Sequence, residues 1–315
     1  MRINKYLLIG LVAFLAFSCK SDDDDLVTIP VRDRGEQAIE DDQALLDYLS
    51  THFYNYEEFE NPGDDFDYKV KFDTIAGENS NKTPIIESDK LITKTVNYQG
   101  IDQQMYILKI REGVGAKPTF ADSTYVTYKG ELLNGTVFDN TTKSPVWFNL
   151  SPYSIVRNGV VASKINGVIE GFKEGLQFFG SASGYTVNAD NTIKWNNDYG
   201  IGAIFIPSGL GYFNIPRAGI PSYSPLVFQF DMLIAVEADH DNDGIPSYLE
   251  DLDGDKDVSN DDSDEDGIPN NSDADDDGDG TPTRDEIEIA EDGTIIFTDS
   301  NNDGTPDYLD PDTFQ

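Results

Sequence analysis

Four short aspartate-rich motifs near the C-terminus carry the clearest chemistry in this sequence of 315 residues. Each motif has Asp or Asn at positions 1, 3 and 5, Gly at position 6 and Pro at position 8. This spacing forms the front half of a Ca²⁺ loop, and an acidic side chain at position 12 completes it. Oxygen ligands without Cys or a useful His select a hard cation over zinc. The predicted ligands are Asp239, Asp241, Asp243, Glu250, Asp262, Asp264, Asp266, Asp273, Asp275, Asp277, Asp279, Glu286, Asp299, Asn301, Asp303 and Asp310.

These motifs start 23, 13 and 24 residues apart, and an additional run from Asp251 to Asp257 is less regular because Lys256 stands where Gly is expected. The alternation resembles thrombospondin type 3 repeats. The resemblance implies a chain that wraps around calcium ions with little regular secondary structure. A disordered polyacid that only solubilises the protein is the alternative. Asp292-Gly293 inside residues 287–298 predicts a small hairpin within the repeats.

A second set of residues, between positions 104 and 236, combines aromatic and apolar side chains in a fixed order. The segments are VTYKGELLNGTVFD at 126–139, Pro145 with Phe148, VIEGFKEGL at 168–176, IPS at 206–208 with Leu210 and Tyr212, Ile220-Pro221, and LVF at 226–228. Together they resemble the FKBP-type peptidyl-prolyl cis-trans isomerases over about 40% of the chain. The sequence departs from the family at Phe172, where Trp is usual, and at Val146, where an aromatic residue usually follows the proline.

The resemblance implies a shallow apolar pocket that binds proline-containing peptides or unfolded client proteins and needs no cofactor for catalysis. It also implies that the Ile169 N–H and the Tyr212 hydroxyl hold substrate carbonyls, while Asp139 and Tyr128 interact with the rotating carbonyl. The predicted pocket residues are Tyr128, Phe138, Asp139, Val168, Ile169, Phe172, Tyr212, Ile220 and Phe228.

The elements that must position these residues are short strands and one helix. Alternating apolar segments at 105–110, 125–128, 146–150, 202–206 and 226–234 predict antiparallel strands, and helical spacing within 167–179 predicts a short helix. The fold class is therefore α+β, with an antiparallel sheet and one short helix on it. The resemblances imply that this is an FKBP-like antiparallel sheet wrapped on one short helix, followed by a calcium-ordered tail. Before the sheet, apolar spacing over 40–59 predicts an amphipathic helix that includes His52, and a strand is expected near 90–98. Compared with compact members of the FKBP-type family, the sequence has insertions near 152–166 and 181–200.

At the N-terminus, Arg2 and Lys5 precede an apolar run of about a dozen residues that is too short to span a bilayer, which needs about 20. Leu15-Ala-Phe-Ser-Cys19 resembles a bacterial lipobox, which implies cleavage before Cys19 and lipid attachment to it. A secretory signal with an incidental Cys is the alternative. The four aspartates at 22–25 resemble an export tag of surface lipoproteins, although a solvated spacer would look the same. We expect a lipid anchor in the outer membrane, with the cell surface favoured over the periplasmic face.

The net charge of −37 divides unevenly between two parts of the chain. Residues 239–315 contain 28 acidic and two basic residues, and the preceding 238 contain 31 and 20. Such acidity excludes a nucleic-acid binder that relies on phosphate contacts. The predicted organisation is a signal peptide at 1–18, an acidic linker at 19–38, a lead-in at 39–103, an isomerase domain at 104–238 and calcium repeats at 239–315.

These features predict a peptidyl-prolyl isomerase that assists the folding of exported or surface proteins. The alternative is a non-catalytic lipoprotein for adhesion or assembly, in which the pocket only binds peptides and the calcium repeats make the contacts.

Overall fold

The computed structural model describes residues 30–313. The predicted signal peptide, the lipidation site Cys19 and the aspartates at 22–25 lie outside the described residues. The chain divides into two units, Met1–Val31 and Arg32–Gln315, and all the architecture below belongs to the second unit. Within the described residues, no helix combines the length and apolar character needed to cross a membrane.

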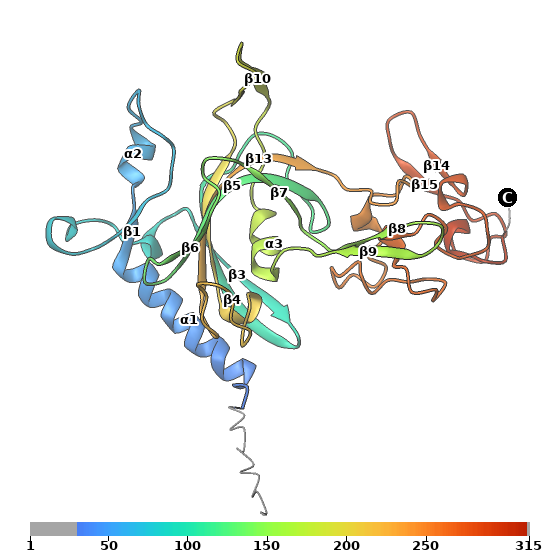
Figure 1. Ribbon diagram of the computed structural model, residues 1–315, viewed down its shortest axis with the longest axis horizontal. Coiled ribbons are helices and arrows are strands. Elements are labelled where there is room, and N and C mark those ends of the chain that lie inside the picture. The colour runs from blue at the N-terminus through green and yellow to red at the C-terminus, as the bar shows by residue number, and fades with distance from the viewer. Residues whose placement is uncertain (1–29, 314–315) are drawn as a thin grey trace, which may run out of the picture. The chain divides into compact units, whose positions relative to one another are not determined.

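A seven-stranded antiparallel sheet organises the middle of the chain (Figure 1). Its strand order is β3-β4-β12-β13-β5-β6, and β7 pairs with β5 beside β6. The strands are β3 (Leu91–Tyr98), β4 (Ile101–Arg111), β5 (Ser123–Leu132), β6 (Val137–Asn140), β7 (Val146–Asn149), β12 (Gly200–Ile206) and β13 (Leu226–Val236). All the predicted strands are present, and β3 joins the sheet although it precedes residue 104. The domain boundaries themselves stay predictions.

Two helices cover opposite faces of this sheet, α1 (Arg34–Thr51) and α3 (Glu170–Leu176). Because side chains alternate along a strand, β12 serves both cores. Ile204 and Ile206 pack in the cluster that contains α3, whereas Ile201 and Phe205 pack with α1. Every residue of β12 is therefore buried. The short helix predicted within 167–179 is confirmed, but the sheet is covered by a helix on each face instead of one.

The N-terminal helix begins and ends earlier than the apolar spacing predicted. Asp33 caps it by accepting hydrogen bonds from the backbone N–H groups of Gly35 (2.8 Å) and Glu36 (3.0 Å), so the helix begins at Arg34, within the segment 19–38 that was predicted as a linker. The helix stops at Thr51 because the next residues form β1 (His52–Tyr54), which pairs with β2 (Phe72–Thr74). His52 therefore lies just outside the helix, and its ring stacks on Tyr48 with centroids 3.8 Å apart.

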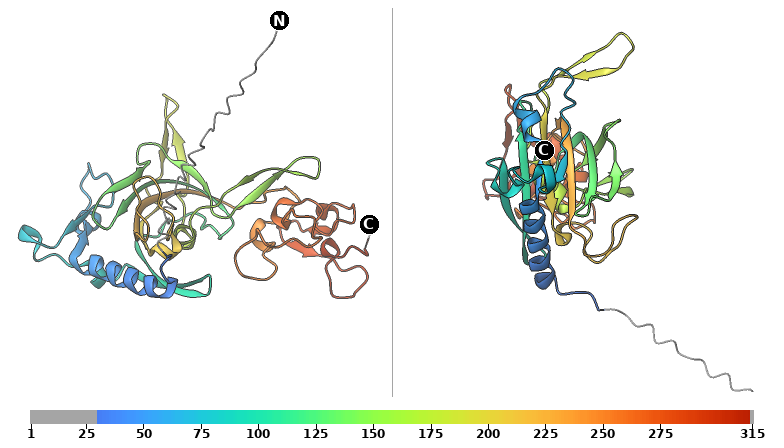
Figure 2. Two further views of the ribbon diagram at one scale, coloured as in Figure 1. Left: turned by 60° about the horizontal axis from the view of Figure 1, so that its bottom comes forward. Right: turned by 90° about the vertical axis from the view of Figure 1, so that its left-hand side faces the viewer.

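Both expected insertions form β-hairpins that leave the main sheet (Figure 2). The first consists of β8 (Tyr153–Val156) and β9 (Val161–Ile165), and the second of β10 (Tyr185–Val187) and β11 (Ile193–Trp195). A short helix α2 (Tyr56–Glu60) follows β1, and the hairpin predicted in the repeats is confirmed as β14 (Ile287–Ile289) and β15 (Ile295–Phe297).

The repeat region consists mainly of turns and bends. A 3₁₀ turn follows the proline of each of the four motifs, at Ser247–Leu249, Asn270–Ser272, Thr283–Asp285 and Asp307–Leu309. The apolar cluster of the repeat region is small, and its buried members are Ile245, Ile287 and Tyr308. The region also contacts the β8–β9 hairpin, where the Ser154 N–H donates to Ser272 Oγ (2.8 Å) and the Tyr153 ring stacks on His240 at 4.1 Å. The first insertion therefore supports the repeats.

Candidate active site

All nine predicted pocket residues line one pocket of about 900 Å³. They come from four parts of the chain that the sheet brings together. Strands β5 and β6 supply Tyr128, Phe138 and Asp139. Val168 and Ile169 directly precede helix α3, and Phe172 lies in it. The loop after β12 supplies Tyr212 and Ile220, and β13 supplies Phe228.

Aromatic rings form the interior of this pocket. The Phe172 ring lies 5.0 Å from that of Phe228 and 5.5 Å from that of Phe148, between centroids. Phe138 meets Phe228 edge to face at 5.5 Å, and the Tyr128 ring lies 5.9 Å from Phe228. Edge-to-face and tilted pairs at these separations are favourable and fix the rings relative to one another. The pocket therefore presents a preformed apolar surface.

The polar groups that are predicted to contact the substrate lie at the pocket. The Tyr128 hydroxyl donates a hydrogen bond to Asp139 Oδ2. Burial, together with this acceptor, raises the pKa of Tyr128 well above its ordinary value, so the hydroxyl keeps its proton at neutral pH. Within residues 30–313, neither the Ile169 N–H nor the Tyr212 hydroxyl has a hydrogen-bond partner, so both are available to a ligand.

The four aspartate motifs adopt one loop geometry. The glycine at position 6 has a φ of 105° in Gly244, 93° in Gly267, 97° in Gly280 and 100° in Gly304. Such angles favour glycine, which explains its recurrence. In each loop the N–H of position 7 donates to the carboxylate at position 5, at distances of 2.6–2.8 Å. In the irregular fifth run, Lys256 takes the glycine position with a φ of 69°.

The loops bring the predicted ligands together. In each of the first three motifs, the carboxylates at positions 1, 3 and 5 offer oxygens within 4.8 Å of one another, and so do Asp251, Asp253 and Asp255. In the fourth motif, Asn301 Nδ2 donates to Asp310 Oδ2 at 2.7 Å, so positions 3 and 12 are neighbours. In the first motif, Glu250 of position 12 lies close to Asp243 of position 5. In the second motif, burial and, to a smaller extent, the charges of Asp266 and Asp264 raise the pKa of Asp273 to about 6.

The chemistry of these loops fits a hard divalent cation. The position-12 residues Glu250 and Glu286 are each 1% exposed, and neither carboxylate has a hydrogen-bond partner among the described residues. Burial and neighbouring carboxylates raise the pKa of Glu250 to about 11 and that of Glu286 to about 8. Buried carboxylates without partners are costly unless a cation or a proton compensates them. Bidentate Glu at position 12 is a typical calcium ligand.

Part of this chain is similar in sequence to FKBP-type peptidyl-prolyl isomerases. The FKBP-type 22 kDa peptidyl-prolyl cis-trans isomerase of Escherichia coli K12 is 28% identical over 151 residues, which cover 47% of this chain and 59% of that protein. FkpA, an FKBP-type isomerase of the same strain, is 29% identical over 124 residues, which cover 39% of this chain and 35% of FkpA. The homology to FKBP-type isomerases therefore involves less than half of this chain.

The homology thus spans only about a third to three fifths of the length of these relatives. Among solved structures, the crystal structure of a peptidyl-prolyl isomerase from Pseudomonas syringae can be superposed with a TM-score of 0.33 at 20% identity. The superposition covers 48% of this chain and 84% of the chain of that isomerase. Residues 240–297, within the repeats, match the protein family described as BamM C-terminal.

Several residues of the FKBP-like pocket were not predicted as site residues. Phe148 belongs to the family pattern, and its ring lies 5.5 Å from those of both Tyr128 and Phe172. It supplies an aromatic wall that Val146 does not. Arg217 also lines the pocket, with its guanidinium 5.3 Å from the centre of the Tyr212 ring. It comes from the loop at 213–219, where the sequence contains no family signal.

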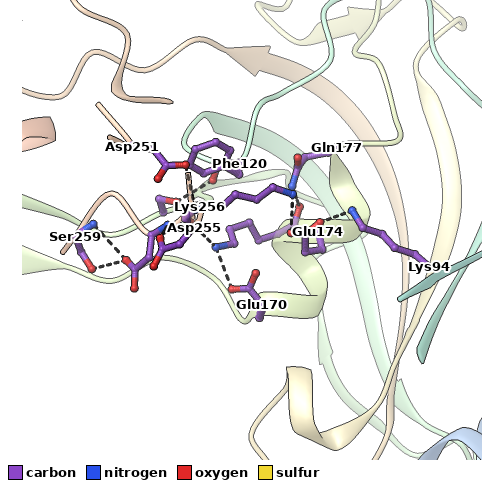
Figure 3. A network of polar contacts seen from close by, with 12 residues as sticks. Lys94, Phe120, Glu170, Glu174, Gln177, Asp251, Asp255, Lys256 and Ser259 are labelled. Atoms are coloured by element: carbon purple, nitrogen blue, oxygen red, sulfur yellow. Dashed lines mark hydrogen bonds and ion pairs between the residues drawn. The ribbon is translucent and has the colours of Figure 1, made fainter. Parts of the chain in front are cut away.

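A second hollow of about 830 Å³ adjoins the pocket and shares Asn166, Gly167 and Val168 with it. Its other walls include the repeat segment from Gly254 to Ser259 and helix α3. Figure 3 shows the polar network that joins these walls. Glu174 of α3 pairs with Lys94 and, at 3.3 Å, with Lys256. The Lys173 ammonium donates to the Lys256 carbonyl at 3.1 Å. The helix that carries Phe172 is thus in direct contact with the repeats.

Proposed function

We propose that this protein is a peptidyl-prolyl cis-trans isomerase that assists the folding of exported or surface proteins. The convergence of all nine predicted residues on one preformed apolar pocket carries the proposal, because these residues are spread over a hundred positions of sequence. The homology to FKBP-type isomerases supports the same activity. We further propose that a lipid on Cys19 anchors the protein in the outer membrane, with the cell surface as the favoured side, and that calcium orders the C-terminal repeats.

The reaction requires no nucleophile and no metal, since no bond is made or broken. Rotation about an X-Pro amide is opposed by a barrier of about 18–20 kcal/mol that arises from amide resonance. In the twisted transition state this resonance is lost, so the amide is less polar than in either planar form. A pocket that holds the proline ring among Phe138, Phe172 and Phe228 therefore favours the twisted state over the planar ones, which is the differential binding that catalysis needs.

The polar groups at the edge of the pocket orient the peptide. In the proposed complex, the Ile169 N–H and the Tyr212 hydroxyl donate hydrogen bonds to carbonyls on either side of the rotating bond. Asp139 and the Tyr128 hydroxyl, which are joined by a hydrogen bond, face the carbonyl that turns. Holding both sides of the bond converts binding energy into the correct orientation for rotation.

A protease-coupled assay on a peptide with one X-Pro bond tests the activity, using Phe138→Ala and Asp139→Asn. We expect kcat/KM to fall about tenfold to a hundredfold for Phe138→Ala. The lost burial of an aromatic ring is worth about 1.5–3 kcal/mol, and each 1.4 kcal/mol of transition-state binding is tenfold in rate. Val137→Ala is the matched control, because Val137 is the neighbour of Phe138 on β6 and is 48% exposed.

An unchanged rate in both pocket variants would place catalysis elsewhere. Tight peptide binding with no turnover in the unmodified protein would instead favour the non-catalytic alternative, a peptide-binding lipoprotein for adhesion or assembly.

A further inference from the structure

Asp276 is a buried carboxylate that the loop pattern does not explain. It occupies position 2 of the third motif, which has no ligand role in a calcium loop of this type. Nevertheless its residue is only 2% exposed, and neither of its carboxylate oxygens has a hydrogen-bond partner among the described residues. Its backbone N–H donates to Thr283 Oγ1 at 3.1 Å, which fixes the chain at this point.

The carboxylate of Asp276 meets two ligands of the first motif. One oxygen each from Asp243, Glu250 and Asp276 lies within 4.8 Å of the others, and all three residues are at most 2% exposed. Both oxygens of Glu250 and Oδ2 of Asp243 also lack hydrogen-bond partners. Asp243 and Glu250 belong to the first motif and Asp276 belongs to the third, so the whole second motif lies between them in the sequence.

No ion pair among the described residues includes Asp243, Glu250 or Asp276. The charge of Arg284 lowers the pKa of Asp243, but by less than burial raises it. Burying a carboxylate without a counter-charge is expensive, and three together add mutual repulsion. The three residues have five unpartnered carboxylate oxygens, and one oxygen of each residue lies within 4.8 Å of the others. A cation with oxygen ligands satisfies such an arrangement.

We propose that Asp243, Glu250 and Asp276 together hold a calcium ion that joins the first motif to the third. The inference rests on the proposed calcium binding of the repeats and adds a site that spans two of them. Calcium suits the site better than magnesium, because magnesium gives up its hydration water reluctantly and rarely takes a cage of protein ligands alone. An ion at this place would close the chain between Glu250 and Asp276 into one loop. The first three motifs would then order together instead of independently.

Asp276→Asn tests the site, and Asp285→Asn is the matched control. Asparagine preserves the shape of the side chain and removes its charge. Asp285 is in the same motif, is exposed and belongs to none of the acidic clusters. Calcium binding to the whole protein would be measured by titration calorimetry and equilibrium dialysis. We expect Asp276→Asn to lose one bound calcium or to weaken one site at least tenfold, and Asp285→Asn to bind as the unmodified protein does.

Thermal unfolding with and without calcium separates a ligand from a merely structural residue. In EDTA, Asp276→Asn should unfold at the same temperature as the unmodified protein or higher, because it removes repulsion. In calcium it should unfold at a lower temperature. Equal calcium number and affinity in Asp276→Asn and the unmodified protein would overturn the proposal, as would equal destabilisation in EDTA and calcium. Absence of calcium binding in the unmodified protein would refute the calcium function of the repeats themselves, which is a different result.

Discussion

Gly130 shows how one residue shapes the pocket. It lies on β5 beside Asp139 of β6, where a Cβ atom would come within 2.5 Å of the Phe138 ring and 3.1 Å of the Phe228 ring. The absence of a side chain is therefore what lets these two rings meet at 5.5 Å. Phe138 is only partly buried, so its ring can turn outward when it is pushed.

Gly130→Ala should therefore reduce activity more than stability. We expect kcat/KM for X-Pro isomerisation to fall about tenfold, as displacement of Phe138 removes part of the apolar contact with the proline ring. The unfolding free energy should change by about 1 kcal/mol or less, because the clash is with the far end of a mobile side chain. Gly63→Ala is the control, since a Cβ at Gly63 meets nothing within 4 Å. Equal losses of activity in the two variants would contradict this role.

The individual residues differ in how far sequence could reveal them. The nine pocket residues were predictable because each stands at a position of the family pattern. Asp276 was not, because its role depends on contact with a loop far away in the chain. Lys256 is an intermediate case. Its place at a glycine position in the loop was visible, but its positive φ and its ion pair with Glu174 were not.

At the scale of elements, helix α3 connects the pocket with the repeats. Its inward face carries Phe172, and Glu174 pairs with Lys94 of β3 and Lys256 of the repeat segment. The glutamate side chain is 4% exposed, while those of the two lysines are 23% and 45% exposed. Burial alone would raise the pKa of Glu174, but the two lysines outweigh it and bring the pKa below its ordinary value.

Glu174→Gln should destabilise the protein in a pH-dependent way. A pKa that is lower in the folded state contributes stability above the unfolded-state value of 4.5, and this stability is lost as the pH falls through the lower folded-state value. We expect a loss of about 1–2 kcal/mol at pH 7, less than the roughly 3–5 kcal/mol of a fully buried pair, because both lysines can reach water.

Urea unfolding between pH 7 and pH 3 measures this difference. The gap between Glu174→Gln and the unmodified protein should narrow as the pH falls below 4.5. Glu237→Gln, at an exposed glutamate outside the ion pairs of the described residues, provides the baseline. A gap that is constant over this range would show that Glu174 acts through its shape and not through its charge.

The boundaries of elements were harder to predict than their presence. The strands of the sheet and α3 follow from alternation and helical spacing. The start of α1 depends instead on a single cap, Asp33, and its end depends on the pairing of β1 with a strand that arrives only at Phe72. Apolar spacing continues through residues 52–59 and therefore extended the predicted helix too far. The two insertion hairpins were visible as added length, but not as strands.

At the scale of the whole molecule, the sheet domain and the acidic repeats differ in the interactions that can stabilise them. The sheet and its two helices form apolar cores on both faces, which are sufficient for a globular domain. The repeats bury few apolar side chains and contain 28 acidic residues against two basic ones. Their order must therefore come from something other than hydrophobic burial, and the proposed calcium ions supply both the missing contacts and the missing positive charge.

Removal of calcium should therefore expand the repeats and leave the sheet intact. In EDTA, the carboxylates at positions 1, 3 and 5 repel one another, and loops held only by Asx-type hydrogen bonds open. Extracellular calcium modules bind at about 10⁻⁴–10⁻³ M, so the transition should occur in that range. Size-exclusion chromatography with light scattering would report a smaller hydrodynamic radius in millimolar calcium than in EDTA, at unchanged mass. Potassium chloride at equal ionic strength controls for screening, which would shrink any polyacid. Equal radii in EDTA and millimolar calcium would contradict the prediction, because they would show that calcium does not order the repeats.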